Sequence, residues 1–146
     1  MSAALKIYDI LQSASKDYKT KLNEIYSSYD ISVTDDSEYI EILSSLEYLD
    51  PSHKPLFAHY SSDCRSDGAD EYMERFLAYL IYRHCTEAND IEDFSARLSF
   101  CLFLERLLAS LICVEQAKDL HTISKLASII SEEIEYSDDN TYALMG

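Results

Sequence analysis

The sequence predicts an all-α protein, with one domain over residues 1–146 and a bundle of about six helices around a central apolar helix at about 91–114. Three observations predict this class. Only two glycines and two prolines occur, which leaves little material for hairpins or tight strand turns. Apolar residues advance by threes and fours, the spacing of one helical face. The 47% hydrophobic content is enough for a folded core despite a formal charge of −15.

The first third of the chain predicts two helices. Apolar and aromatic residues from Ile7 to Tyr29 keep helical spacing, so one helix is expected over residues 3–29. Asp35 and Glu38 have the spacing of a capping box, with Asp in place of Ser or Thr. A second helix is therefore expected over residues 36–49.

A short irregular segment is expected next. Asp50 reads as a helix cap followed by Pro51 at the first helical position. Pro55 comes too soon afterwards for a regular helix, so a turn-helix is predicted over residues 51–60. A loop follows, and a further helix is predicted over residues 69–88.

The last third of the chain is the most apolar. The central helix, residues 91–114, carries a long run of Leu, Phe and Ile, yet this run is shorter than a membrane span. Another helix is expected over residues 119–136, and Ser137 has the chemistry to cap a last short one. Acids crowd the end of the 119–136 helix, where the macrodipole disfavours anions; this indicates a contact site. They are Glu132, Glu133 and Glu135.

The charge balance bounds the partners. With 27 Asp and Glu against 12 Lys and Arg, the chain repels phosphates, so we expect neither nucleic-acid nor membrane binding. A basic protein partner and mimicry of nucleic acid remain open. The simplest interpretation of the acids is a solvated, soluble surface.

The four cysteines predict reduced thiols in a cytoplasmic protein. Cys64, Cys85, Cys101 and Cys113 form no C-x-x-C pair, and the first eleven residues lack the pattern of a signal peptide. Cys101 and Cys113 fall in an apolar helical stretch, where cysteine is usually a small core residue.

No catalytic, cofactor-binding or metal-ligating set is expected. The Gly-rich phosphate loops, the nucleophile elbow, the H-E-x-x-H motif and the EF-hand loop are all missing. The residues available to a metal follow no known ligand spacing, so surface or interface histidines are the better interpretation. They are His53, His59, Cys64, His84, Cys85 and His121.

Glu105 and Arg106 interrupt the apolar helix. An unpaired buried charge is costly, so an ion pair is expected, for example between Glu105 and either Arg83 or Arg75. A polar cleft lined by these groups is the functional alternative.

Three tracts of the sequence follow the pattern of a known family. Residues 73–83 (MERFLAYLIYR) are similar to a Leu-Glu-Asn-Tyr-Leu tract followed by aromatics and Arg. Residues 131–140 (SEEIEYSDDN) are similar to Ser-Arg-x-Ile-Glu-His-Ser-x-x-Asn, and residues 46–50 (LEYLD) to a third, weaker tract. Together these tracts resemble the C-terminal half of flagellin lysine-N-methylases, and the resemblance covers about three quarters of the chain, from near Ser37 to its end.

The departures from that family fall on polar positions. Arg75 stands where the family favours Asn, Glu132 where it favours Arg, and Tyr136 where it favours His. Because the first two change charge in opposite senses, an ion pair between Arg75 and Glu132 is conceivable. The candidate polar and interaction positions are Glu74, Arg75, Arg83, Glu105, Arg106, Glu132, Glu135, Tyr136 and Asn140.

The resemblance implies methyl transfer to flagellin lysines, with an S-adenosylmethionine-type donor and a metal or iron–sulfur centre in an N-terminal cysteine-rich region. This chain has no such cysteine cluster and nothing that looks able to bind the donor. The resemblance therefore implies a non-catalytic helical domain that docks flagellin, or another lysine-rich protein, or supports the cysteine-rich part.

Two alternatives stay open. The first is a free-standing acidic interaction protein, a nucleic-acid mimic or an inhibitor of a basic partner, using a row of carboxylates. That row would comprise Asp35, Asp36, Glu38, Glu41, Glu132, Glu133, Asp138 and Asp139. The second is an enzyme acting through a cleft of Arg83, Glu105 and Glu135.

Overall fold

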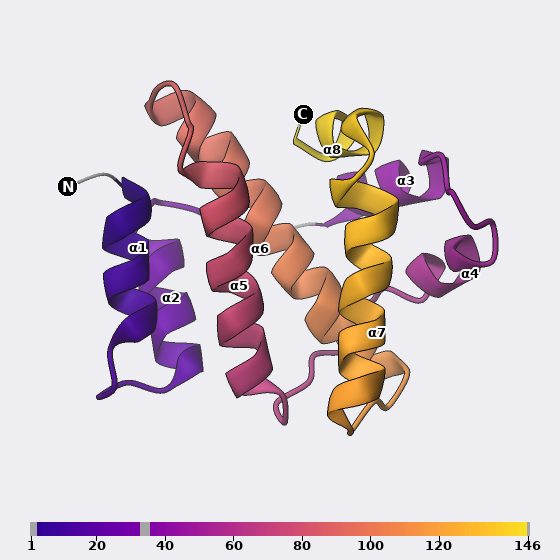
Figure 1. The fold of residues 1–146 in the computed structure, drawn as a ribbon, viewed down its shortest axis with the longest axis horizontal. Helices are drawn as coiled ribbons and strands as arrows, with labels where there is room; N and C mark the ends of the chain where they lie inside the picture. The colour runs from indigo at the N-terminus through magenta and orange to yellow at the C-terminus, as the bar shows by residue number, and fades with distance from the viewer. Residues whose placement is uncertain (1–2, 33–35, 146) are drawn as a thin grey trace. The chain divides into compact units, whose positions relative to one another are not determined.

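The computed structural model describes residues 3–32 and 36–145, and these residues form helices and links with no strand. The prediction of an all-α protein is confirmed. Figure 1 shows the elements in chain order. They are α1 (Ala3–Gln12), α2 (Tyr18–Ser28), α3 (Ser37–Ser45), α4 (His53–Ala58), α5 (Asp70–Cys85), α6 (Ile91–Val114), α7 (Leu120–Ile130), the π-helical turn η1 (Ser131–Glu135) and α8 (Asp138–Met145).

The backbone groups into two compact units. Among the described residues, the first unit comprises 3–32 and 69–102, and the second comprises 36–68 and 103–145. The division falls inside α6, between Leu102 and Phe103. One domain over residues 1–146 stays a prediction, and each unit is described here by itself.

The first unit is built from α1, α2, α5 and the first half of α6. The prediction of one helix over residues 3–29 is wrong, because the chain breaks after Gln12 and restarts at Tyr18. Asp17 caps the new helix, its carboxylate accepting the backbone N–H of Thr20 at 2.8 Å. Figure 1 shows α1 and α2 side by side next to α5.

The core of the first unit is apolar with one buried cation. Fully buried side chains come from α1, α2 and α5, including Ile7, Ile25 and Leu77. Lys21 is only 6% exposed. Its ammonium donates to the carbonyl of Leu11 at 2.8 Å and pairs with Glu74, so the buried charge is satisfied.

In the second unit, α3 and α4 are shorter than expected. α3 ends at Ser45, where the hydroxyls of Ser44 and Ser45 donate to carbonyls three residues back and compete with the helical bonds. α4 starts at His53, so Pro51 precedes the helix instead of occupying its first position. The predicted capping residue Asp35 lies outside the described residues.

The C-terminal helix predicted over residues 119–136 changes character part-way. α7 is a regular α-helix capped by Asp119, whose carboxylate accepts the N–H of Thr122 at 2.7 Å. From Ser131 the chain widens into a π-helical turn, a form that often occurs at functional sites. The predicted cap of the last helix is confirmed: the Ser137 hydroxyl accepts the N–H of Asn140 at 3.2 Å.

The cysteines depart from the expectation of four reduced thiols. Cys64 and Cys113, which are 49 positions apart in the sequence, form a disulfide with their Cα atoms 5.8 Å apart. Cys85 and Cys101 are buried, and neither is part of a disulfide. Sequence spacing could not reveal the pair, because Cys64 lies in a loop and its partner is near the end of α6.

The longest helix, α6, is confirmed with the predicted bounds. Nearly every side chain from Leu98 to Ile112 is buried. Within the described part of the chain, no helix combines the length and apolarity needed to cross a bilayer.

Candidate functional site: a polar junction in the second unit

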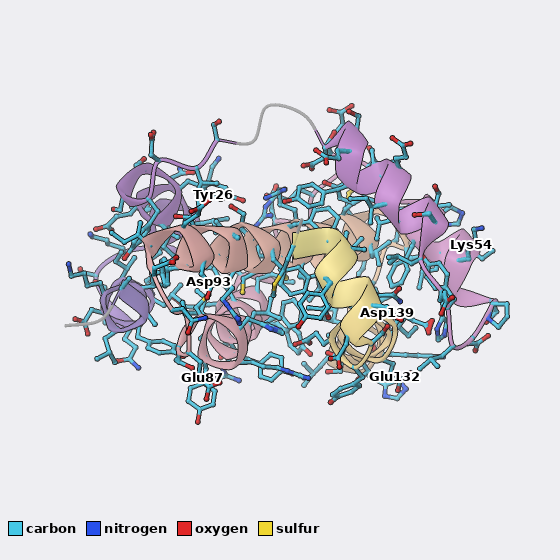
Figure 2. The ribbon with its side chains drawn as sticks, turned by 90° about the horizontal axis from the view of Figure 1, so that it is seen from above. Tyr26, Lys54, Glu87, Asp93, Glu132 and Asp139 are labelled. Atoms are coloured by element: carbon cyan, nitrogen blue, oxygen red, sulfur yellow. A yellow bond between two sulfur atoms is a disulfide. The ribbon has the colours of Figure 1, made fainter. Side chains whose placement is uncertain are left out.

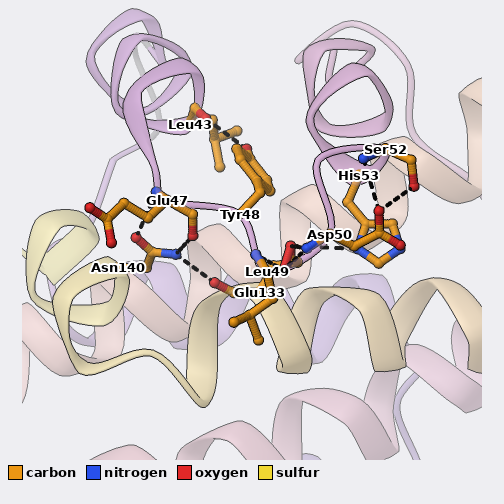
Figure 3. Close-up of polar contacts among 9 residues, drawn as sticks. All are labelled: Leu43, Glu47, Tyr48, Leu49, Asp50, Ser52, His53, Glu133 and Asn140. Atoms are coloured by element: carbon orange, nitrogen blue, oxygen red, sulfur yellow. Dashed lines mark hydrogen bonds and ion pairs between the residues drawn. The ribbon is translucent and has the colours of Figure 1, made fainter.

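The buried carboxylate of Glu133 organises a polar junction (Figure 3). Glu133 belongs to η1 and is 1% exposed. Its Oε1 accepts the backbone N–H of Leu49 at 2.7 Å and that of Asp50 at 3.3 Å. The widened turn thus directs a carboxylate inward to the link between α3 and α4. The acid that breaks the local charge rule at this helix end is stabilised by two amide donors.

Asn140, at the start of α8, completes the junction. Its Oδ1 accepts the N–H of Glu47 at 3.3 Å, and its Nδ2 donates to the carbonyls of Glu47 at 2.8 Å and Glu133 at 2.7 Å. Asn140 is 3% exposed, so these bonds satisfy a buried amide. Among the candidate positions, Asn140 is the one that ties three segments together.

His53 lies between two carboxylates at the edge of the junction. Its Nε2 is 3.6 Å from Oδ2 of Asp50, and its Nδ1 is 3.5 Å from Oε2 of Glu133. The hydroxyl of Ser52 donates to Asp50 at 2.7 Å. This bond and the one from the backbone N–H of Ser52 hold the pKa of the Asp50 carboxyl below its usual value. Burial, together with the nearby charge of Glu133, raises the pKa of Tyr48 to about 12.

This geometry suits binding better than catalysis. The Ser52 hydroxyl donates to Asp50, so it is directed at a carboxylate and not at the imidazole of His53. Within the described residues, no group of three or more His, Cys, Asp and Glu could hold a metal ion. The junction can position a backbone segment and present the side chains around it.

A second polar cluster surrounds the charged pair of α6. Glu105 is fully buried, and its two carboxylate oxygens accept hydrogen bonds from the guanidinium of Arg65 at 2.8 and 2.5 Å. The expected ion pair of Glu105 therefore exists within the second unit, and Arg65, a loop residue, supplies the cation. The loop is further held to α6 because Ser61 and Ser110 exchange two hydrogen bonds of 2.9 Å.

Arg106 has its own acidic partner. Its guanidinium is 3.0 Å from Asp36, which is 6% exposed and also accepts the hydroxyl of Tyr60. The same cation lies over the rings of Tyr39 and Phe103, which stack at 4.2 Å. Burial and the bond to Asp36 raise the pKa of Tyr60.

The three candidate residues of α5 have partners within the first unit. Glu74 pairs with Lys21. Arg75 is 2.9 Å from Glu71 one turn away, an exposed pair, and a pair between Arg75 and Glu132 stays a prediction. Arg83 donates to the hydroxyl of Tyr79 at 2.9 Å.

The remaining candidates lie on η1 and just beyond it. Glu135 is 5% exposed and accepts the hydroxyl of Ser131 at 2.7 Å. Glu132 is exposed, as is Tyr136 with 67% of its side chain accessible. In the eight-carboxylate row, Asp36 and Glu133 are buried, and Asp35 lies outside the described residues. The predicted row is therefore interrupted.

The candidate positions taken from the sequence include neither Glu133 nor His53, although Glu133 was among the acids that indicate a contact site and His53 among the residues considered for a metal. The crowding of acids at a helix end was the available signal for Glu133, and its inward direction follows from the π turn, which has no sequence signature here.

Comparison with protein-family models, with curated proteins and with solved structures finds no match for this chain.

Proposed function

We propose that this chain is a non-catalytic, acidic protein-binding module. Its binding surface is the acidic face, defined as the exposed carboxylates of α3, the link after it, η1 and α8. The occupant is a basic, lysine-bearing protein segment.

The uneven distribution of charge supports this proposal most strongly. Residues 35–68 and 103–146 hold 16 Asp and Glu against five Lys and Arg, a formal charge of −11 out of −15. Neither residues 22–53 nor residues 126–146 contain Lys or Arg. The carboxylates of the acidic face are Glu38, Glu41, Glu47, Asp50, Glu132, Asp138 and Asp139. Figure 2 labels Glu132 and Asp139, on η1 and α8.

The junction supports the proposal by holding this face in one arrangement. Asn140 and Glu133 fix the link between α3 and α4 through backbone hydrogen bonds of 2.7 to 3.3 Å. A partner would therefore not have to order this link on binding, which lowers the entropic cost of association.

The choice of a lysine-bearing partner rests on charge and on the resemblance to flagellin lysine-N-methylases. Two of the resembling tracts, residues 46–50 and 131–140, meet in the junction, so they act as one structural feature. We therefore take flagellin as the first partner to test, in a cytoplasmic setting. Any methyl donor and metal or iron–sulfur centre would belong to a cysteine-rich part.

Mimicry of nucleic acid is the alternative, and the buried positions of Asp36 and Glu133 weaken it. A mimic needs regularly spaced exposed charge. In a competition assay, a mimic would release duplex DNA from a basic DNA-binding protein, whereas a lysine-docking module would leave the duplex bound.

Binding to flagellin and to an oligolysine peptide tests the proposal at about 0.1 M and about 1 M salt, where the screening length falls from about 10 Å to about 3 Å. We expect binding at low salt and its loss at high salt. The same peptide with acetylated lysines should not bind. The triple variant Glu38→Gln, Glu41→Gln, Glu132→Gln should bind oligolysine about tenfold more weakly, since each exposed charge contributes up to about 1 kcal/mol.

A matched control removes the same charge from the first unit. Asp9→Asn, Glu87→Gln and Glu92→Gln are all exposed, and Glu87 is labelled in Figure 2. This variant should bind like the parent. Equal loss in both triples would reduce the effect to net charge and contradict a defined face. If the chain binds oligolysine but not flagellin, flagellin is rejected as the partner and the binding module stands. If the chain binds neither, the binding module itself is rejected.

A further inference from the structure

The first unit contains two cysteines, Cys85 and Cys101, whose thiols are in contact and take no part in the acidic face. The Sγ atoms of Cys85 and Cys101 are 3.8 Å apart. The two residues are 2% and 0% exposed, and neither is part of a disulfide. The Cys101 thiol also donates to the carbonyl of Leu80 at 3.4 Å, which fixes its position on α6.

The two sulfurs lie in van der Waals contact. A disulfide needs a separation of about 2.05 Å, so the sulfurs must approach by about 1.8 Å. Cys85 is the last residue of α5. The end of a helix adjusts its backbone more easily than its middle, because the last carbonyls have no helical partners. Cys101, in the middle of α6, can stay in place.

One of these two cysteines lines a pocket of the first unit. The first unit contains a cavity of about 450 Å³ between the start of α1, the end of α5 and the start of α6, and Cys85 is part of its wall while Cys101 is not. Its wall is mainly apolar, with Ala4, Ala88 and Phe94 among the lining residues. A small uncharged oxidant that enters the pocket therefore meets residue Cys85, whose sulfur is 3.8 Å from that of Cys101.

We propose that Cys85 and Cys101 are a reversible disulfide site oxidised by a diffusible peroxide, with Cys85 as the attacking residue and Cys101 as the resolving residue. The Cys85 thiol loses its proton as its sulfur attacks one peroxide oxygen; the O–O bond breaks, the leaving hydroxide takes up that proton to become water, and Cys85 becomes a sulfenic acid. The Cys101 sulfur then attacks the sulfenyl sulfur and expels a second water. Two thiols and one hydrogen peroxide yield one disulfide and two waters.

A disulfide fits this site better than a two-thiolate metal centre. Both sulfurs are buried, and a pair of thiolates around a monovalent soft cation would leave a net negative charge out of water. The described residues offer no third His, Cys, Asp or Glu to complete a common metal geometry. The disulfide is neutral and avoids that charge.

Peptide mapping of the whole chain under non-reducing conditions tests the site. After treatment with hydrogen peroxide, we expect the Cys85 and Cys101 peptides to be cross-linked with the loss of two hydrogens, and dithiothreitol should restore both thiols. The bond between Cys64 and Cys113 provides an internal control, because its peptides should stay paired before and after peroxide.

Matched alanine variants test the order of the two steps. In Cys101→Ala, the Cys85 sulfenic acid has no resolving thiol and should be trapped by dimedone. In Cys85→Ala, Cys101 should take at least about tenfold less dimedone, because it does not line the pocket. Circular dichroism confirms that each variant is folded. The peptide mapping uses the parent chain, so its result holds even if a variant fails to fold.

Three results would overturn the proposal. They are the survival of both thiols after peroxide, cross-links from either residue to Cys64 or Cys113, and equal dimedone labelling of Cys85 and Cys101 in the two variants.

Discussion

Replacing the buried carboxylate of Glu133 is the sharpest test of the junction. Glu133→Ala removes the acceptor of two backbone N–H groups, those of Leu49 at 2.7 Å and Asp50 at 3.3 Å. A hydrogen bond to a charged group is worth about 1.5 to 3 kcal/mol, so losing these two bonds should lower the free energy of unfolding by about 3 to 6 kcal/mol. This is a large part of the total for a domain, about 5 to 15 kcal/mol.

Two companion variants separate the hydrogen bonds from the charge. Glu133→Gln keeps a carbonyl acceptor where the carboxylate was and should cost only about 1 kcal/mol. Glu132→Ala changes the exposed neighbour on the same turn and should stay within about 0.5 kcal/mol of the parent. Urea denaturation followed by circular dichroism gives all three values.

Amide hydrogen exchange adds a local readout. The side chain of Leu49 is 78% exposed, yet its N–H is bonded to the buried carboxylate of Glu133. Its exchange should therefore be slow in the parent chain and fast in Glu133→Ala. If Glu133→Ala and Glu132→Ala cost the same, or if the Leu49 amide exchanges rapidly in the parent, the junction does not hold this link.

Three further predictions concern charge and cross-linking. Arg65→Ala leaves the fully buried Glu105 without its bidentate partner and should lower the free energy of unfolding by about 3 to 5 kcal/mol in urea denaturation. Reducing the bond between Cys64 and Cys113 should lower it by up to about 4 kcal/mol, from the entropy of closing a loop of this length. Hydrogen bonds to the first turn of α7 lower the pKa of the Asp119 carboxyl. The carboxylate therefore stabilises the fold above the ordinary pKa of Asp, and this stabilisation is lost as the pH falls through the lowered pKa. Asp119→Asn should abolish this part of the dependence of stability on acid pH.

Each of these has a control or a contradicting result. Arg75→Ala removes an arginine from an exposed pair and should cost under about 0.5 kcal/mol, so a cost equal to that of Arg65→Ala would refute the buried-pair argument. Detection of four titratable thiols in protein purified without reductant would contradict the disulfide. Asp67→Asn, in an exposed loop, should leave the acid profile unchanged, and a shift like that of Asp119→Asn would remove the cap as its cause.

The sequence predicted best those elements whose signal is local and strong. α6 has the expected bounds because its apolar run is long and is followed by polar residues. The break after Gln12 was missed because apolar residues on either side of it stay in helical phase. The signal for that break is local, a serine-rich turn ending in Asp17, whose side chain caps α2.

The site was harder to predict because its partners are distant in sequence. Glu105 required a cation, but Arg65 is 40 residues away in a loop that has no periodicity. Glu133 and Glu132 are adjacent acids, and only the geometry of the π turn buries one and exposes the other. Pairing energies act across the fold, so a one-dimensional pattern can require a partner without identifying it.

The most direct test of the acidic face is a titration of the isotope-labelled chain with oligolysine, followed by nuclear magnetic resonance of the backbone amides. The account predicts that the largest shift changes fall within residues 37–50 and 131–142 and disappear in about 1 M salt. Equal changes around the exposed acids of residues 87–93, or no changes anywhere, would contradict a defined binding face.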